Sequence, residues 1–482
     1  MKLLFATSEL YPLIKIGGLA DVSNNLPVAL KNRRQAVRVL LPAYQSVLVP
    51  LKEVKVIAKF DLNGYSVRLL ETHLAPSRLT IWLVDCPELF NRPGSPYINA
   101  QGQDWPDNAQ RFGLFCEVAA KVATDELGLN WLPELVHCND WQTGLTPVYL
   151  NQRPASERPK TVFTIHNLAF QGLFSYDVFQ ALQLPSELWS SEALEYYGQL
   201  SFIKGGLVFA DQITTVSPRY AEEITTAEFG YGLEGLLQAR NDKLTGILNG
   251  IDNQQWNPQT DTNLVHNYSV DLLSGKIKNK RALQRDFGLL LNDKAMLIGV
   301  VSRLYKQKGI DLLLQNIAAI SKHAIQLIIL GTGDSKIEGE LIEAAAAYPV
   351  TVAVQVGYDE QLAHQIVAGA DVFAIPSRYE PCGLTQLYSL RYGTLPLVRN
   401  VGGLADTVVN STTETIANNT ANGFVFDEAS PDALYESILH AASCFADKNL
   451  WQNLQSSAMK QDFSWGRSAR NYLRLYQGLS KP

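Results

Sequence analysis

Short apolar runs recur along the whole chain, and each one ends in small or polar residues before a stretch with helical periodicity. Near-continuous apolar strands that alternate with amphipathic helices are typical of parallel sheets covered on both faces. The pattern therefore predicts an α/β protein built on doubly wound parallel sheets. The predicted strands are residues 2–8, 36–42, 134–140, 161–167, 212–217 and 243–250 in the first half, and residues 295–303, 324–331, 351–357, 371–377 and 395–400 in the second.

A polar segment with few strand-forming residues, 253–269, interrupts this rhythm, and a chain of 482 residues is too long for one ordinary hydrophobic core. We therefore predict two Rossmann-like domains, residues 1–252 and 253–459, that face a central cleft. Residues 460–482 are predicted to contain a helix that crosses back onto the first domain. Ligands of such folds lie beyond the carboxyl ends of the strands, so the residues that follow strands are the candidates for function.

Composition narrows the class of partner. The chain is 46% hydrophobic and 18% charged, with a formal net charge of −6, which gives no electrostatic reason to expect nucleic acid or an anionic membrane as a partner. The five cysteines form no CxxC pair, so neither a disulfide framework nor a cysteine metal site is expected. We expect a cytoplasmic protein with no membrane span; a plastid would apply only to a plant source, and no transit peptide is recognised.

Several phosphate-binding and catalytic motifs are missing. The segment GTGDSK (331–336) carries Lys336 where a dinucleotide fingerprint needs its third glycine, and no GxxxxGK[ST] loop, HExxH or GxSxG occurs. There is also no Asp-x-Asp pattern, which many metal-dependent sugar transferases use to hold a nucleotide diphosphate. We therefore expect no metal and no cofactor, and the charge of any bound phosphate must be balanced in another way.

The segment KIGGLADV (15–22) follows the first predicted strand and opens a helix. Gly17 and Gly18 allow the backbone to approach a ligand closely, and the helix amides with the Lys15 ammonium could bind an anion. The alternative is a tight turn with a solvated lysine. The same five letters, GGLAD, recur in VGGLADTV (401–408), where Val401 replaces the lysine, so that second copy is expected to shape a turn.

Basic and polar groups follow two strands of the second half. In SRLYKQKG (302–309), Arg303 and Lys308 could clamp two phosphates without a metal. In IPSRYEPCGLTQLYSLRYG (375–393), Thr385 begins a helix, while Glu380 suits sugar or ribose hydroxyls. The alternatives are an exposed basic turn and a carboxylate that caps a helix.

The first half places histidines at the ends of two strands. His137 and Asp140 belong to ELVHCNDWQTGL (134–145), and His166 and Asn167 belong to TVFTIHNLAFQG (161–172). A single histidine at a strand end is usually structural. Two such strand ends in one domain, each followed by polar groups, favour a site.

Together these segments resemble bacterial glycogen synthases and plant starch synthases, which are retaining glucosyltransferases with the two-domain GT-B fold. The matching motifs occur in the same order as in the family and cover nearly the whole chain. The motifs that carry it are KIGGLADV, NRPGSPY (91–97), HCNDW, FTIHNLAFQG, IKGGLVFADQITTVSPRYAEEI (203–224), GILNGID (246–252), SRLYKQKG, PSRYEPCGLTQLYSLRYGTLPLV (376–398) and VGGLADTV.

The resemblance implies a role for each matching position. It implies that the first domain binds the glucan acceptor and the second binds the nucleotide sugar. The residues expected to take part in catalysis are His166, Glu380, Asp140, Lys308 and Arg303, and those expected to bind substrate are Lys15, Gly17, Gly18, Asp21, Tyr97, Asn167, Asn249, Tyr358, Cys382, Gly383, Leu384 and Thr385. Among these, Lys15, Arg303 and Lys308 would contact the diphosphate and Tyr358 would stack on the adenine.

The implied reaction is transfer of α-glucose from ADP-glucose to the non-reducing 4-hydroxyl of an α-1,4-glucan, with retention and with no double-displacement nucleophile. The Glu-x7-Glu pattern of related transferases ends here at Tyr388, so only Glu380 carries over. Three alternatives remain open: a GT-B enzyme that uses UDP-glucose, a sugar-nucleotide epimerase of the same fold, and a glucan-binding scaffold without activity. Phosphate contacts do not identify the base, and only Tyr358 indicates adenine. The sequence does not fix the oligomeric state.

Overall fold

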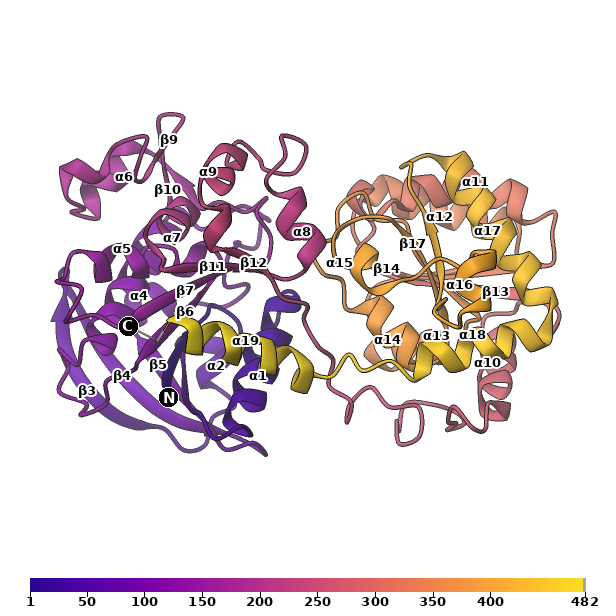
Figure 1. The fold of residues 1–482 in the computed structure, drawn as a ribbon, viewed down its shortest axis with the longest axis horizontal. Coiled ribbons are helices and arrows are strands. Elements are labelled where there is room, and N and C mark those ends of the chain that lie inside the picture. The colour runs from indigo at the N-terminus through magenta and orange to yellow at the C-terminus, as the bar shows by residue number, and fades with distance from the viewer. Residues whose placement is uncertain (480–482) are drawn as a thin grey trace. The chain divides into compact units, whose positions relative to one another are not determined.

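The computed structural model describes residues 1–479; residues 480–482, the end of the predicted tail segment, lie outside the described residues. The chain divides into two compact units. Unit 1 comprises residues 1–249 together with the segment that begins at Trp465, and unit 2 comprises Gly250–Ser464. In Figure 1, unit 1 is indigo to magenta with the yellow helix α19, and most of unit 2 is orange.

Unit 1 is built on a nine-stranded sheet in the order β12-β11-β7-β6-β1-β2-β5-β4-β3. The first seven strands in this order are parallel, and β4 and β3 extend the sheet with antiparallel pairs. The bounds are β1 Lys2–Ala6, β2 Ala36–Pro42, β3 Lys55–Leu62, β4 Tyr65–Leu74, β5 Leu79–Asp85, β6 Leu135–Asn139, β7 Lys160–Ile165, β11 Gln212–Thr215 and β12 Leu244–Gly246. A small second sheet joins β8 Leu173–Phe174, β10 Gln199–Ser201 and β9 Glu195–Tyr196.

The central strands of unit 1 are buried almost throughout because helices cover the sheet. The helices are α1 Gly18–Lys31, α2 Gln45–Leu48, α3 Pro87–Phe90, α4 Asn108–Ala123, α5 Thr146–Asn151, α6 Tyr176–Ala181, α7 Phe202–Phe209, α8 Pro218–Glu223, α9 Glu234–Ala239 and α19 Trp465–Leu479. In α1 the buried side chains recur every three to four residues, as an amphipathic helix requires. Apolar runs with both faces covered are what the sequence pattern predicts for such a sheet.

The antiparallel extension of unit 1 is a difference from the sequence prediction. Strand β4 largely alternates between exposed and buried positions, and β3, at the edge of the sheet, is exposed or half-buried except at Leu62. A search for continuous apolar runs does not find this period of two. Strand β5 is a continuous buried run, LTIWLVD, that the prediction also missed.

Helix α19 packs against α1 in unit 1 (Figure 1). Its buried residues include Tyr472 and Tyr476, and the Tyr476 hydroxyl lies 2.7 Å from Nδ1 of His137 on β6. The Ser468 hydroxyl donates to the Leu248 carbonyl at 2.6 Å. The last helix therefore completes the core of unit 1.

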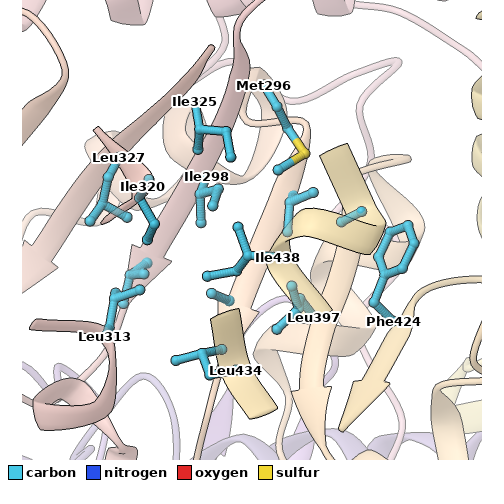
Figure 2. Close-up of a cluster of buried hydrophobic side chains, with 14 of the residues drawn as sticks. Met296, Ile298, Leu313, Ile320, Ile325, Leu327, Leu397, Phe424, Leu434 and Ile438 are labelled. Carbon is cyan, nitrogen blue, oxygen red and sulfur yellow. The ribbon is translucent and has the colours of Figure 1, made fainter. Parts of the chain in front are cut away.

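Unit 2 holds a six-stranded parallel sheet in the order β15-β14-β13-β16-β17-β18. The strands are β13 Met296–Val301, β14 Ile325–Gly331, β15 Val352–Val356, β16 Val372–Ile375, β17 Leu395–Arg399 and β18 Phe424–Phe426. The helices are α10 Ser274–Asp286, α11 Ile310–Ile320, α12 Ser335–Ala347, α13 Glu360–Gly369, α14 Thr385–Arg391, α15 Gly402–Thr407, α16 Thr413–Ala417, α17 Pro431–Ala446 and α18 Lys448–Met459. Figure 2 shows one face of this sheet, where Ile298 lies near Ile438 of α17 and Leu327 lies near Ile320 of α11. The two parallel-sheet α/β units confirm the predicted fold class.

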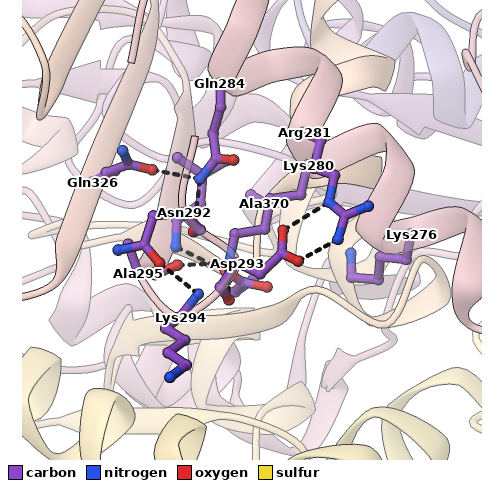
Figure 3. Close-up of polar contacts among 12 residues, drawn as sticks. Lys276, Lys280, Arg281, Gln284, Asn292, Asp293, Lys294, Ala295, Gln326 and Ala370 are labelled. Carbon is purple, nitrogen blue, oxygen red and sulfur yellow. Dashed lines mark hydrogen bonds and ion pairs between the residues drawn. The ribbon is translucent and has the colours of Figure 1, made fainter. Parts of the chain in front are cut away.

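Two buried lysines anchor α10 to the amino-terminal side of the unit 2 sheet. The Lys280 ammonium lies 2.6 Å from the Asp371 carboxylate, and Lys276 donates to the Ala368 carbonyl at 2.9 Å. Burial lowers the pKa of Lys276 to about 7. Figure 3 shows this region, with Arg281 directed at Asp293 on the surface. These contacts are structural, because they lie at the strand ends opposite to those that carry the candidate site.

Among the residues that the structure describes, no helix has both the length and the apolarity needed to cross a membrane.

Candidate active site

The candidate residues of unit 1 follow strands that are neighbours in its sheet. Strands β7, β6 and β1 are adjacent and parallel, so their carboxyl ends share one edge. Glu9 and Lys15 come after β1, Asp140 comes directly after β6, and His166 comes directly after β7. The sheet order changes direction at β1, which is the kind of switch point where ligands of doubly wound folds bind.

Asp140 has a strained backbone. Its φ of 55° and ψ of −179° lie in a region that residues with a Cβ rarely adopt. Its Oδ1 accepts the His166 N–H at 2.7 Å and the Asn167 N–H at 3.4 Å, so the carboxylate fixes the turn after β7. Burial raises the pKa of Asp140 to about 7 in spite of these hydrogen bonds. A strained carboxyl that titrates near neutral pH is typical of a functional site.

His166 is oriented by the residue that precedes Asp140. Its Nε2 lies 3.0 Å from Oδ1 of Asn139, whose side-chain amide donates to the Ala6 carbonyl at 2.9 Å. With Asn139 so oriented, its Oδ1 is an acceptor and Nε2 of His166 must carry the proton. Burial lowers the pKa of His166 to about 3, so the imidazole is neutral at physiological pH.

His137 does not belong with these residues. It is fully buried in β6 and lies between Tyr476 and the Thr164 hydroxyl, which is 2.5 Å from Nε2. Burial lowers its pKa to about 3. It is a core histidine, as a single histidine at a strand end usually is.

The Lys15–Gly18 segment is exposed, and the Lys15 ammonium pairs with Asp21 at 3.1 Å. The space beside the Gly17 Cα is open, so this glycine turn leaves room for a ligand. The Gly17 N–H, however, donates to Glu9 at 2.9 Å. An anion at this turn would therefore meet Lys15 and the Gly18 amide, while the Gly17 amide is already used.

Two further candidates of unit 1 have informative hydrogen bonding. The Tyr97 hydroxyl donates to Glu9 Oε1 at 2.8 Å and lies 2.8 Å from the Ser8 hydroxyl. Asn249 is buried, and its Oδ1 meets no hydrogen-bond donor within residues 1–479. A buried acceptor without a partner is costly in a folded protein, so Asn249 fits a role in binding a hydroxyl group of a ligand.

In unit 2, Lys308 and Glu380 follow the neighbouring parallel strands β13 and β16. Their side chains meet, with the Lys308 ammonium 2.5 Å from Glu380 Oε2, and Ser377 donates to the same oxygen at 3.0 Å. The structure thus brings together the basic and acidic candidates of this unit. Arg303 is exposed, and its side chain forms no hydrogen bond or ion pair within the described part of the chain.

The second GGLAD copy packs directly against the turn that carries Glu380. The Gly403 N–H donates to the carbonyls of Glu380 and Pro381 at 3.2 and 3.1 Å. A Cβ on Gly402 would lie 2.0 Å from the Glu380 carbonyl oxygen, and one on Gly403 would lie 2.1 Å from the Cys382 carbonyl oxygen. Gly402 also has a φ of +46°. Glycine is therefore required at both positions, and this turn packs against the backbone of the segment that carries Glu380.

The remaining unit 2 candidates lie in two places. Cys382, Gly383 and Leu384 form the turn before α14, which begins at Thr385, and the Gln386 amide donates to the Cys382 carbonyl at 2.8 Å. Tyr358 follows β15 and is 69% exposed, and its hydroxyl donates to the Glu360 carboxylate.

Tyr388, which stands where related transferases have a second glutamate, stacks on Trp256 with ring centroids 3.8 Å apart. Trp256 also stacks on His364 at 3.7 Å. Trp256 is therefore one of the buried residues that anchor the polar segment 253–269 within unit 2; Tyr268 is another, and its hydroxyl donates to the Tyr392 carbonyl at 2.7 Å. Nothing in the sequence pattern indicated this stack.

Within residues 1–479, no group of three or more His, Cys, Asp or Glu side chains is arranged to hold a metal ion.

Comparison with known proteins covers nearly the whole chain. Residues 2–239 match the family described as starch synthase catalytic domain, and residues 284–456 match glycosyl transferases group 1. The chain is 51% identical to the glycogen synthase of Thioalkalivibrio sulfidiphilus, with 99% of this chain and 100% of that protein covered. It is 50% identical to glycogen synthase 2 of Nitrosococcus oceani, with 99% and 97% covered.

Solved structures agree with the sequence relatives. The catalytic domain of starch synthase IV from Arabidopsis thaliana, bound to ADP and acarbose, matches with a TM-score of 0.88 and 31% identity over 99% of both chains. A sucrose-phosphate synthase from Thermosynechococcus elongatus matches with a TM-score of 0.60 at 18% identity, over 99% of this chain and 98% of that chain, and this likeness shows the fold alone.

Proposed function

Because this chain belongs to the family of glycogen and starch synthases, we propose that its donor is ADP-glucose and its acceptor the non-reducing end of an α-1,4-glucan. The enzyme is a retaining glycosyltransferase that transfers glucose from a nucleotide sugar to a glucan. The observation that carries the choice of donor is the likeness to a starch synthase bound to ADP, at 31% identity over 99% of the chain. The exposed ring of Tyr358 supports an adenine contact.

We assign the diphosphate to Arg303 and Lys308, with Lys15 and the Gly18 amide as further contacts. Cleavage of the donor leaves negative charge on the nucleoside diphosphate, and fixed cations stabilise that charge as it develops. The guanidinium of Arg303 is exposed and has no partner among residues 1–479, so it is available for this contact. Lys308 pairs with Glu380, so the two form a preorganised site in which donor phosphate can share the ammonium.

Asp140, His166, Asn167, Asp21, Asn249 and Tyr97 are assigned to the glucose and acceptor. The glucosyl group becomes positive as the bond to the diphosphate breaks, and the Asp140 carboxylate in its ionised form favours that charge. The buried Oδ1 of Asn249 accepts a hydrogen bond from a sugar hydroxyl. The turn from Cys382 to Thr385 is assigned to phosphate. No side chain is assigned as a covalent nucleophile, and none is assigned to a metal.

The test is a donor comparison on the purified full chain. Labelled ADP-glucose and UDP-glucose are incubated separately with glycogen, and label is followed into α-1,4-linked polymer. We expect faster transfer from ADP-glucose, and equal or faster transfer from UDP-glucose would refute the donor assignment. Transfer that survives a chelator supports the metal-free mechanism, and loss of transfer contradicts it.

We also propose a cytoplasmic location. All five cysteines are buried, and no disulfide joins any of them within residues 1–479, which fits a reducing compartment.

A further inference from the structure

Glu9 is a buried carboxylate that the sequence analysis did not single out. Its side chain lies between two segments that carry proposed binding residues and is only 4% exposed. Oε2 accepts the N–H groups of Ile16 and Gly17 at 2.8 and 2.9 Å, and Oε1 accepts the Tyr97 hydroxyl at 2.8 Å. All of these partners are protein groups in unit 1, so the structure gives Glu9 a role that acts through them.

The free-energy cost of burying the Glu9 carboxylate indicates that this side chain has a specific structural role. No ion pair of Glu9 occurs within the residues described, and burial raises the pKa of its carboxyl. Buried carboxylates without a cation destabilise a fold unless hydrogen bonds compensate them. Here the compensating groups are the backbone of the glycine turn and the hydroxyl of Tyr97.

We propose that Glu9 is a positioning residue of the glucosyl-transfer site, which holds the Lys15–Gly17 segment and Tyr97 in one fixed arrangement. The segment needs such a support because residues 15–18 are exposed and the space beside Gly17 is open. Fixing Ile16 and Gly17 places the Lys15 ammonium at the start of α1, beside Asp21. This inference rests on the proposed roles of Lys15 and Tyr97.

The first test measures the turn itself, without substrate. Glu9→Ala removes the acceptor, so amide hydrogen exchange at Ile16 and Gly17 should become about ten- to a hundredfold faster, the factor expected for losing a hydrogen bond to a charged acceptor. Glu9→Gln keeps an oxygen for the two amides and can donate to Tyr97, so protection should stay near that of the unchanged protein. If Glu9→Ala does not fold, Glu9→Asp replaces it, because the shorter side chain withdraws the carboxylate from both amides.

The second test separates binding from chemistry. Lys15 is proposed to contact the diphosphate, which is already present in the bound donor. Glu9→Ala should therefore weaken donor binding and raise the KM for ADP-glucose about tenfold, with a smaller decrease in kcat. Glu9→Gln should restore both constants to within about twofold. In a double-mutant cycle, Glu9→Ala should add little to the KM effect of Lys15→Ala, because both changes act on the same contact.

Asp211→Ala is the matched control. Asp211 is also a carboxylate that accepts a backbone N–H, from Thr161 at 2.9 Å, but it lies at the amino-terminal ends of the unit 1 strands, opposite to the candidate site. It should lower the melting temperature and leave exchange at Ile16 and Gly17 unchanged. Unchanged exchange in Glu9→Ala or Glu9→Asp would overturn the inference even in an active enzyme. Absence of glucose transfer in the unaltered protein would instead overturn the proposed function, and the exchange result would still stand.

Discussion

The Lys308 ammonium lies 2.5 Å from the Glu380 carboxylate, and the two residues follow the adjacent parallel strands β13 and β16. Both side chains are largely withdrawn from solvent, which strengthens their attraction over that of a surface pair. Each group therefore depends on the other for compensation of its charge. The pair is a single unit of the proposed site.

Removing either partner should leave the other charge uncompensated. We expect Lys308→Ala and Glu380→Ala each to lower kcat/KM for ADP-glucose by about a hundredfold or more, as loss of a preorganised charge does. The double variant should be far less active than wild type yet much better than the product of the two single effects. The measurement is a double-mutant cycle on kcat/KM. Strictly multiplicative losses would show that the two groups act independently.

The raised pKa of Asp140 predicts how the rate of the reaction depends on pH. Its pKa of about 7 lies above the ordinary value, so the carboxyl is neutral below pH 7 and charged above it. If the charged form favours the developing glucosyl cation, kcat/KM should rise about tenfold per pH unit below 7 and level off above it. His166, with a pKa of about 3, does not titrate in this range.

The pH profile of kcat/KM in Asp140→Asn is the measurement. This variant should be much less active and should lose the step near pH 7. A step that persists in Asp140→Asn would assign the titration to another group.

Strand ends are the part of the candidate site that the sequence pattern can indicate. Asp140 and His166 were identified because buried apolar runs end at those residues and neighbouring parallel strands align their carboxyl ends. Glu9 could not be found in this way, since its partners at Ile16 and Gly17 are set by the path of a loop. The pairing of Lys308 with Glu380 likewise depends on β13 lying next to β16, which sequence order does not reveal.

The repeated GGLAD segment shows the same limit. The two copies look alike as letters, and each precedes or begins a helix. The surroundings differ, because the space beside Gly17 is open and a Cβ on Gly403 would strike the Cys382 backbone. The packing around each copy decides which one can contact a ligand and which one supports a turn. In the sequence, the only indication of this difference is that Lys15 precedes the first copy while Val401 precedes the second.

The second copy gives a prediction with a close control. Gly403→Ala places a Cβ 2.1 Å from the Cys382 carbonyl oxygen, so the turn that carries Glu380 must shift. We expect a loss of activity of about a hundredfold, since a shift near 1 Å misplaces the reacting groups, and a destabilisation of about 1–3 kcal/mol from overpacking.

The control for this prediction is Gly339→Ala in the same unit. Gly339 lies inside helix α12 with nothing within 4 Å of its added Cβ, and alanine there should stabilise by about 0.5–1 kcal/mol. Activity and urea unfolding of both variants are measured together. Normal activity in Gly403→Ala would mean that the turn does not depend on this packing.

The last helix predicts a stability effect in unit 1. Tyr476→Phe removes the hydroxyl 2.7 Å from Nδ1 of His137 and leaves a buried imidazole nitrogen without a partner. The free energy of unfolding should fall by about 1–3 kcal/mol, as for other buried polar groups that lose a partner. Tyr435→Phe is the matched control, because Tyr435 makes a similar bond to His323 at 2.9 Å on an exposed face. There solvent replaces the lost hydroxyl, so the change should stay below about 0.5 kcal/mol. Urea unfolding of both variants is the measurement, and equal effects would show that α19 is not part of the unit 1 core.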